Sequence, residues 1–211
     1  MPIIFYSKNE DFIQMMKNKG YKAYNDDIKN YKSNKKTFYV SPANSLGYMS
    51  GGYDYALTQI MPGIDVKLRE KIKKSPFKTF SNKHYLPIGS SIIVKHSHNE
   101  YLISAPTMLI PQNVSETNNA YYATKSALHN ILLYDDYDLN KINIVFTSLC
   151  CGYGGMNIIE SANQMARAIC EHSKIYNTTM SYNNGVLYNE PNLHEQPRIF
   201  DNNEWFTEND D

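Results

Sequence analysis

The chain of 211 residues lacks the features that mark several large protein classes. It has three cysteines, two of them adjacent at Cys150 and Cys151, so it cannot build the disulfide framework of a small secreted domain. Its apolar runs, such as residues 142–146, are far shorter than the ~20 residues that span a bilayer. Its first twelve residues lack the basic and apolar regions of a secretory signal. We therefore expect an intracellular protein, cytoplasmic or nuclear, with no membrane partner.

An excess of charge is also missing. The 21 Lys and Arg residues balance the 21 Asp and Glu residues, so the formal net charge is zero. Proteins that grip a nucleic-acid backbone usually carry a clear basic excess, and the sequence therefore argues against a nucleic-acid partner. The basic stretch at residues 67–83 is typical of a solvated helix face, although it could steer an anionic ligand or partner.

The residues that are present describe one globular unit. Hydrophobic residues make up 42% of the chain and charged residues 20%, as in ordinary folded domains, and the length suits a single domain. We assign residues 1–190 to that domain and residues 191–211 to a polar, acidic C-terminal tail, with Trp205 and Phe206 held back against the domain. We expect a monomer.

Short β-branched and aromatic runs alternate with helical patterns, which predicts an α/β fold. A hairpin should join the strands on either side of residues 96–100. The predicted strands are residues 3–6, 37–40, 90–95, 101–104 and 142–147, with a weak strand at 185–188. The predicted helices are residues 11–18, 53–61, 65–74, 115–133 and 158–172.

Two loops rich in glycine connect a strand to a helix, at residues 41–52 and 148–155. Their glycines are Gly47, Gly51, Gly52, Gly152, Gly154 and Gly155. Helix N-termini offer unpaired N–H groups to anions, and open α/β sheets bind ligands where their strands end, so the loops could flank a diphosphate. The alternative is that the glycines only supply positive φ in tight turns, because neither GxxxxGK[ST] nor GxGxxG is present.

The first loop and its flanks carry a resemblance to a known family. The stretch VSPANSLGYMSGGYDYAL at residues 40–57 resembles the first ligand-binding loop of macro domains, the ADP-ribose-binding family. The matching pattern is an asparagine, six residues, two glycines, one residue and an aspartate, here Asn44, Gly51, Gly52, Tyr53 and Asp54.

Three further segments extend the resemblance over roughly residues 3–170. Asp27 and Ile28 lie in a DDI sequence similar to the family's turn that holds the adenine amino group. SAPTMLIP at residues 104–111 resembles a phage-and-bacteria-like subgroup, and SLCCGYGGM at residues 148–156 resembles that subgroup's second phosphate loop.

The resemblance implies a three-layer α/β/α fold with a mixed central sheet. It implies binding of ADP-ribose or an ADP-ribosylated protein and hydrolysis of ADP-ribosyl linkages, with no cofactor and no metal. Asn44 and Asp54 would be the catalytic residues. The ligand-binding residues would be Asp27, Ile28, Ser41, Ala43, Gly51, Gly52, Tyr53, Ser148, Cys150, Cys151, Gly152, Tyr153, Gly154, Gly155 and Met156.

The chain also departs from the family pattern. Ser41 and Pro42 stand where the family usually has asparagine and alanine, and Tyr53 replaces a smaller aliphatic residue. Gly154 occupies the position of an aromatic residue that packs beside the distal ribose. Two other functions therefore stay open: a reader that binds ADP-ribose without turnover, and a phosphatase acting on ADP-ribose 1″-phosphate.

Each candidate residue also has an ordinary structural explanation. Asp27 suits a turn or N-cap, Asn44 suits a turn, and Asp54 in a first helical turn is favoured by the helix dipole. The cysteine pair lacks the spacing of a metal site or a paired histidine, and His96 with His98 lacks a third ligand.

Overall fold

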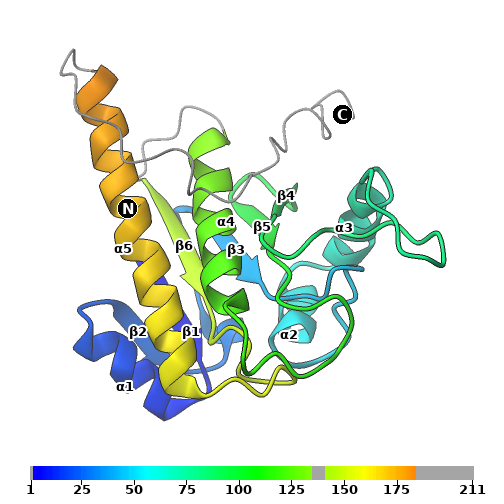
Figure 1. Cartoon of the computed structure of the whole chain (residues 1–211). Coiled ribbons are helices and arrows are strands. Elements are labelled where there is room, and N and C mark those ends of the chain that lie inside the picture. Colours follow the sequence, from blue (N-terminus) through cyan, green and yellow to red (C-terminus); the bar gives the residue numbers. More distant parts are fainter. Residues whose placement is uncertain (1, 135–140, 184–211) are drawn as a thin grey trace.

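The computed structural model of the chain describes residues 2–134 and 141–183 and contains one mixed sheet of six strands (Figure 1). The strand order is β2-β1-β6-β3-β5-β4, and all neighbours are parallel except the antiparallel pair β4 and β5. The strands are β1 (Ile3–Ser7), β2 (Lys22–Asn25), β3 (Lys36–Ser41), β4 (Ile92–Lys95), β5 (Glu100–Ser104) and β6 (Ile142–Phe146).

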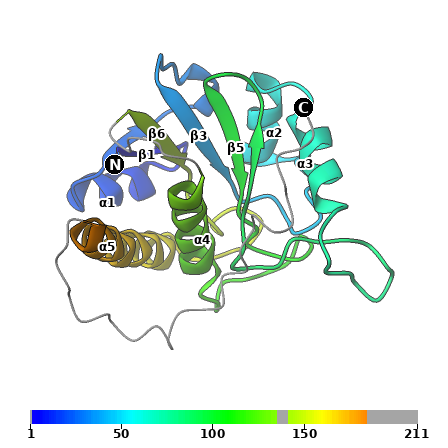
Figure 2. The same cartoon turned by 90° about the horizontal axis from the view of Figure 1, so that it is seen from above.

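Helices cover both faces of this sheet, which confirms the predicted three-layer α/β/α fold. Helices α1, α4 and α5 lie on one face and α2 and α3 on the other (Figure 2). The helical elements are α1 (Glu10–Asn18), the short 3-10 helix η1 (Ile28–Asn30), α2 (Gly52–Ile60), α3 (Ile64–Ile72), α4 (Asn119–Leu133) and α5 (Ile158–Asn183). In the described part of the chain, no helix combines the length and apolar character that crossing a membrane requires.

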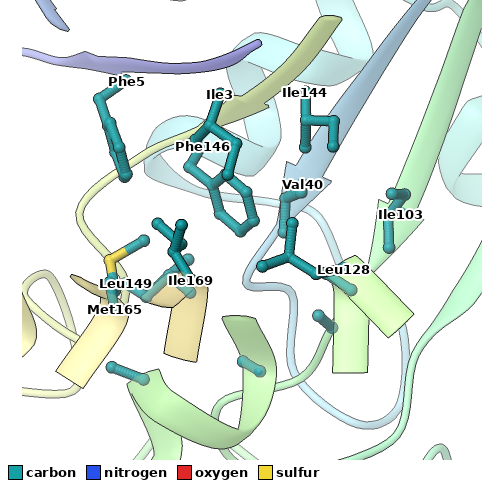
Figure 3. Close-up of a cluster of buried hydrophobic side chains, with 14 of the residues drawn as sticks. Ile3, Phe5, Val40, Ile103, Leu128, Ile144, Phe146, Leu149, Met165 and Ile169 are labelled. Atoms are coloured by element: carbon teal, nitrogen blue, oxygen red, sulfur yellow. The ribbon is translucent and has the colours of Figure 1, made fainter. Parts of the chain in front are cut away.

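Alternation along the strands divides the apolar side chains between two cores. Phe5 and Phe146 point toward α4 and α5, where they meet Leu128, Met165 and other buried side chains (Figure 3). The residues that alternate with them along the strands, such as Ile4 and Val145, point to the opposite core beneath α2 and α3. Because strand side chains alternate with a period of two, nearly continuous apolar strands are required wherever both faces are covered.

The predicted elements that fall on described residues are confirmed, with shifts at several ends and two omissions. Strand β2 and helix η1 were not predicted. Helix α4 begins at Asn119 rather than at residue 115, because the preceding residues form turns in which the Thr117 N–H donates to the Val114 carbonyl. Helix α5 continues past residue 172 to Asn183, a stretch without glycine or proline. The predicted strand at 185–188 and the acidic tail, with Trp205 and Phe206, lie outside the described residues.

Candidate functional site

The two loops rich in glycine begin at the carboxyl ends of neighbouring strands, at the same end of the sheet. Strands β3 and β6 pair in parallel, with Phe38 beside Ile144 and Tyr39 beside Val145. Their carboxyl ends therefore lie about one strand spacing apart, ~4.8 Å. The first loop (residues 41–52) leads into α2 and the second loop (residues 148–155) precedes α5, as Figure 1 shows at the lower end of the sheet.

A connecting segment after β5 links the two loops. The Ser45 N–H in the first loop donates to the Met108 carbonyl at 2.9 Å, and the Val114 N–H donates to Gly154 in the second loop at 2.8 Å. Asn113 from the same segment lies beside Gly155. Residues 105–114, which include most of the segment that resembled the macro-domain subgroup, thus hold both loops in place.

The first loop is anchored below by Ser41, the last residue of β3. Ser41 is fully buried; its hydroxyl donates to Asp54 Oδ1 at 2.7 Å and accepts the Ala43 N–H at 3.2 Å. Ala43 is also buried, so neither residue presents a side chain to solvent. Both side chains therefore support the conformation of the loop from its buried side.

Asn44 has the role of a turn residue in this loop. Its side-chain oxygen accepts the N–H groups of Leu46 at 3.1 Å and Tyr48 at 3.4 Å. These two bonds occupy the amide oxygen and leave the amide NH₂ as the group that can donate to a ligand hydroxyl.

Asp54 lies in the first turn of α2, where its carboxylate faces Ser41. Burial raises the pKa of this carboxyl from its ordinary value to about 7, although the Ser41 hydroxyl bond acts in the opposite direction. A carboxyl with this pKa changes charge near neutral pH, as a general base does. The Asp54 carboxylate can therefore accept a proton under physiological conditions.

Gly51, Gly52 and Tyr53 form the beginning of α2. Open space surrounds the Cβ positions of both glycines. Because the N-cap residue is Gly51, no capping side chain occupies the first N–H groups of the helix. The Tyr53 ring packs against the core beneath α2, and its buried hydroxyl has no hydrogen-bond partner among the described residues. Tyr53 therefore presents its backbone, rather than a bulky ring, to the outer side of the loop.

The second loop is folded tightly around Cys150, whose φ of 64° is unusual for a residue with a side chain. The Met156 N–H donates to the Cys150 carbonyl at 3.0 Å, and Met156 is buried. Burial raises the pKa of the Cys150 thiol to about 12 and also raises that of Cys151. Both thiols are therefore protonated at neutral pH, which disfavours nucleophilic or metal-binding roles.

Gly154 is required by packing. A Cβ at this position would lie 2.6 Å from the Cys150 carbonyl oxygen and 2.8 Å from Val114 Cγ2. No aromatic residue fits here, whereas the preceding Tyr153 is 80% exposed and Gly152 has open space around its Cβ position. The aromatic side chain of this loop is thus displaced by one residue from the family position.

Asp27 follows β2 and therefore also lies near the carboxyl ends of the parallel strands. It caps η1 by accepting the Lys29 N–H at 3.0 Å, and it pairs with the Lys8 ammonium at 2.9 Å. The Lys8 bond, then the Lys29 backbone bond, hold the pKa of Asp27 below its ordinary value. Ile28 is buried under this turn. Asp27 is therefore a permanent carboxylate near neutral pH.

Ser7 and Lys8 belong to the site but were missed in the sequence. The Ser7 hydroxyl lies 3.2 Å from that of Ser148, while Lys8 contacts Asp27, so the end of β1 connects the Asp27 turn to the second loop. They could have been predicted from their position at the carboxyl end of the first predicted strand, where open α/β sheets bind ligands. Among the described residues, no group of three His, Cys, Asp or Glu side chains could hold a metal ion.

Comparisons with known proteins agree with this architecture. A family model described as Macro-like domain matches residues 4–186. The Oceanobacillus iheyensis macrodomain, solved as a variant with ADPR, is similar with a TM-score of 0.53 and 18% identity over 76% of this chain and 91% of that chain. The same macrodomain with ADP matches at 0.53 and 18%, over 76% and 89%. The Mycobacterium tuberculosis DarG macrodomain matches at 0.49 and 15%, over 66% and 84%.

Proposed function

The chain belongs to the Macro-like domain family, and on that premise we propose that it binds ADP-ribose and hydrolyses ADP-ribosyl linkages on proteins. The observation that carries the proposal is the convergence of two loops rich in glycine at the ends of β3 and β6. Open space at Gly51, Gly52 and Gly152 lets a diphosphate approach the backbone N–H groups. The distal ribose would lie toward Asn44, and the adenine toward Asp27.

The spacing of residues in a solved relative supports this assignment. Variants of the O. iheyensis macrodomain have been solved at an asparagine, at a glycine seven residues later and at an aspartate ten residues after the asparagine. Asn44, Gly51 and Asp54 have the same spacing. One of those variants was solved with ADPR.

In the proposed reaction, a water molecule attacks the anomeric carbon of the distal ribose. The bond between this carbon and the carboxylate oxygen of the modified protein breaks, and a water proton passes to Asp54. Because Oδ1 of Asp54 accepts the Ser41 hydroxyl, Oδ2 is the oxygen left to accept the water proton. A nearby carboxylate also favours the oxocarbenium-like charge of such a transition state.

The second candidate function is a reader that binds ADP-ribose without turnover. The packing at Gly154 favours it, because no aromatic side chain fits at the position from which one would hold the distal ribose in a reactive pose. Phosphatase action on ADP-ribose 1″-phosphate would use the same two loops. Release of ADP-ribose from protein mono-ADP-ribosylated on aspartate or glutamate separates the hydrolase from both alternatives, and phosphate release identifies the phosphatase.

Calorimetry with ADP-ribose tests the binding site directly. We expect a binding free energy of about −7 to −9 kcal/mol, which corresponds to micromolar affinity, and much weaker binding of adenosine, which lacks the diphosphate. Gly51→Ala places a methyl group in the phosphate space without strain, because Gly51 has extended backbone and open surroundings. It should weaken ADP-ribose binding at least tenfold while the melting temperature stays unchanged.

Gly154→Ala is the matched control for that substitution. Its methyl group would collide with the Cys150 carbonyl, so this variant should lose thermal stability together with binding. Equal affinity for adenosine and ADP-ribose, or a Gly51→Ala variant that binds ADP-ribose normally, would refute the two-loop site.

A further inference from the structure

A basic surface lies beside the first loop. Residues 71–99 contain six lysines and no aspartate or glutamate, although the whole chain is neutral. The Lys71 ammonium donates to the Ile93 carbonyl of β4 at 3.2 Å, which ties the end of α3 to the edge of the sheet. We call the surface formed by the lysines of residues 71–95 the basic face; these lysines are Lys71, Lys73, Lys74, Lys78, Lys83 and Lys95. Lys73 also pairs with Glu70 at 2.6 Å, so Lys78 and Lys83 are the ones on which the test below depends.

A hairpin-like projection, the finger (residues 75–86), extends from this face. Lys78 and His84 form an antiparallel bridge, and the Thr79 N–H donates to the Lys83 carbonyl at 2.9 Å. Phe80 at its tip is completely exposed. The finger points away from the sheet beyond α3 in both views (Figures 1 and 2). An ordered projection with an exposed aromatic tip between lysines is typical of an interaction surface.

The complementary surface is found in the same chain. Residues 190–211 contain seven aspartates and glutamates, one arginine and no lysine, a charge of opposite sign and equal size to that of residues 71–99. They also contain Phe200, Trp205 and Phe206. We propose that this C-terminal segment docks on the basic face of its own chain, with its carboxylates against the lysines and an aromatic side chain against Phe80.

The length of the segment allows this contact. Helix α5 ends at Asn183, and the 28 residues from 184 to 211 can extend to about 90 Å. A domain of this size is only about 40 Å across, so the segment can reach any face of it. Because the segment is tethered, its effective concentration near the basic face is in the ~mM range, where even weak ionic contacts are occupied.

The fluorescence of Trp205 tests the proposal in the full chain, because Trp205 is its only tryptophan. Docking should give blue-shifted emission and at least twofold weaker acrylamide quenching than in a free peptide of residues 190–211. The double variant Lys78→Glu with Lys83→Glu reverses two exposed charges on the finger and should move both properties to the peptide values. Addition of 0.5 M NaCl to the wild type should act in the same direction, since salt at about this concentration screens exposed charges.

The matched control is Lys19→Glu with Lys22→Glu, which reverses two exposed lysines near β2, at the opposite edge of the sheet. This control should keep wild-type fluorescence, and circular dichroism should show that both double variants fold. The proposal is wrong if wild-type Trp205 already behaves as in the free peptide, or if the two double variants give the same result. Emission that depends on protein concentration would also overturn it, because the segment would then bind a second copy.

Discussion

At the scale of single residues, the environment of Asp54 is the most informative part of the site. A surface carboxylate at a helix N-terminus would be stabilised in its ionised form by the helix dipole. Asp54 instead lies against the buried Ser41, and burial raises its pKa to about 7. The ionised form is therefore less stable in the folded chain than in water, which suits a group that must accept a proton and costs stability at high pH.

The pH dependence of turnover tests this role. If Asp54 is the base, kcat/KM should rise with pH through about 7, because only the ionised carboxylate accepts the proton from water. Ser41→Ala removes a hydrogen bond that favours the ionised form, so the midpoint should move to higher pH. Asp54→Asn should lower turnover by ~10²–10⁴ while ADP-ribose affinity stays within a few-fold. A midpoint near pH 4, or a flat profile, would contradict the assignment.

His172 provides a separate prediction for stability. This residue of α5 is buried; its ring lies beside the Leu128 backbone, but neither ring nitrogen makes a well-formed hydrogen bond to a described residue. Burial, reinforced by His129, lowers its pKa to about 4, although the Leu128 backbone acts in the opposite direction. The unfolded chain thus binds a proton more readily between pH 6.5 and 4, and stability that is full above pH 6.5 is lost as the pH falls. The loss should reach about 3 kcal/mol near pH 4.

Urea unfolding across this pH range measures the effect. His172→Leu removes the titrating group and two unpaired polar atoms, so it should flatten the pH dependence and retain stability at pH 7. His98→Gln replaces an exposed histidine in the turn between β4 and β5 and should leave the wild-type slope unchanged. An equal slope in all three proteins would show that His172 is not responsible.

At the scale of elements, the first loop combines two tasks in Asn44. The side-chain oxygen accepts two backbone N–H groups within the loop, while the amide NH₂ is available for a ligand. Asn44→Asp preserves the accepting oxygen and removes the donor, whereas Asn44→Ala removes both. We therefore expect Asn44→Asp to keep the wild-type melting temperature and to lose ADP-ribose affinity. Asn44→Ala should lose about 1 kcal/mol or more from the free energy of unfolding and a similar amount from the binding free energy.

Thermal unfolding and calorimetry on these two variants separate the tasks. If Asn44→Asp binds ADP-ribose as well as the wild type does, the NH₂ group makes no ligand contact and Asn44 is only a turn residue. Ser50→Ala, an exposed substitution later in the same loop, serves as the control and should change neither quantity.

The elements also show which parts of the fold a sequence can predict. Buried strands such as β6 were predictable because β-branched and aromatic residues dominate them; in β6 only Asn143 interrupts the apolar run. Strand β2 was missed because its four residues are mostly exposed and polar, and pairing with β1 defines it. The same holds for the site: local sequence patterns predicted some of its features, and others depend on contacts between separate segments. Glycine spacing indicated both loops, but the close packing at Gly154 and the contact between Lys8 and Asp27 depend on segments distant in sequence.

At the scale of the whole molecule, the site depends on one sheet shared by two cores. The first loop rests on α3, where Gly47 is packed against Ile72, and the second loop leads into α5 on the other face. A ligand that binds both loops therefore connects elements that belong to opposite cores. Because the cores share every central strand, we expect a single cooperative unfolding transition.

ADP-ribose should stabilise that transition as a whole. A ligand at a hundredfold excess over its Kd adds about 2.7 kcal/mol to the free energy of unfolding, and a domain of this size gains roughly 2–4 °C per kcal/mol. Calorimetric scans should therefore show a melting temperature about 5–10 °C higher with saturating ADP-ribose. Adenosine at the same concentration should give a much smaller shift, because it cannot connect the two loops. The Gly51→Ala variant should melt like the wild type without ligand and lose most of the shift with it. A full shift in that variant would mean that ADP-ribose binds elsewhere, whereas two separate transitions would mean that the two cores unfold independently and that the loops are not coupled through the sheet.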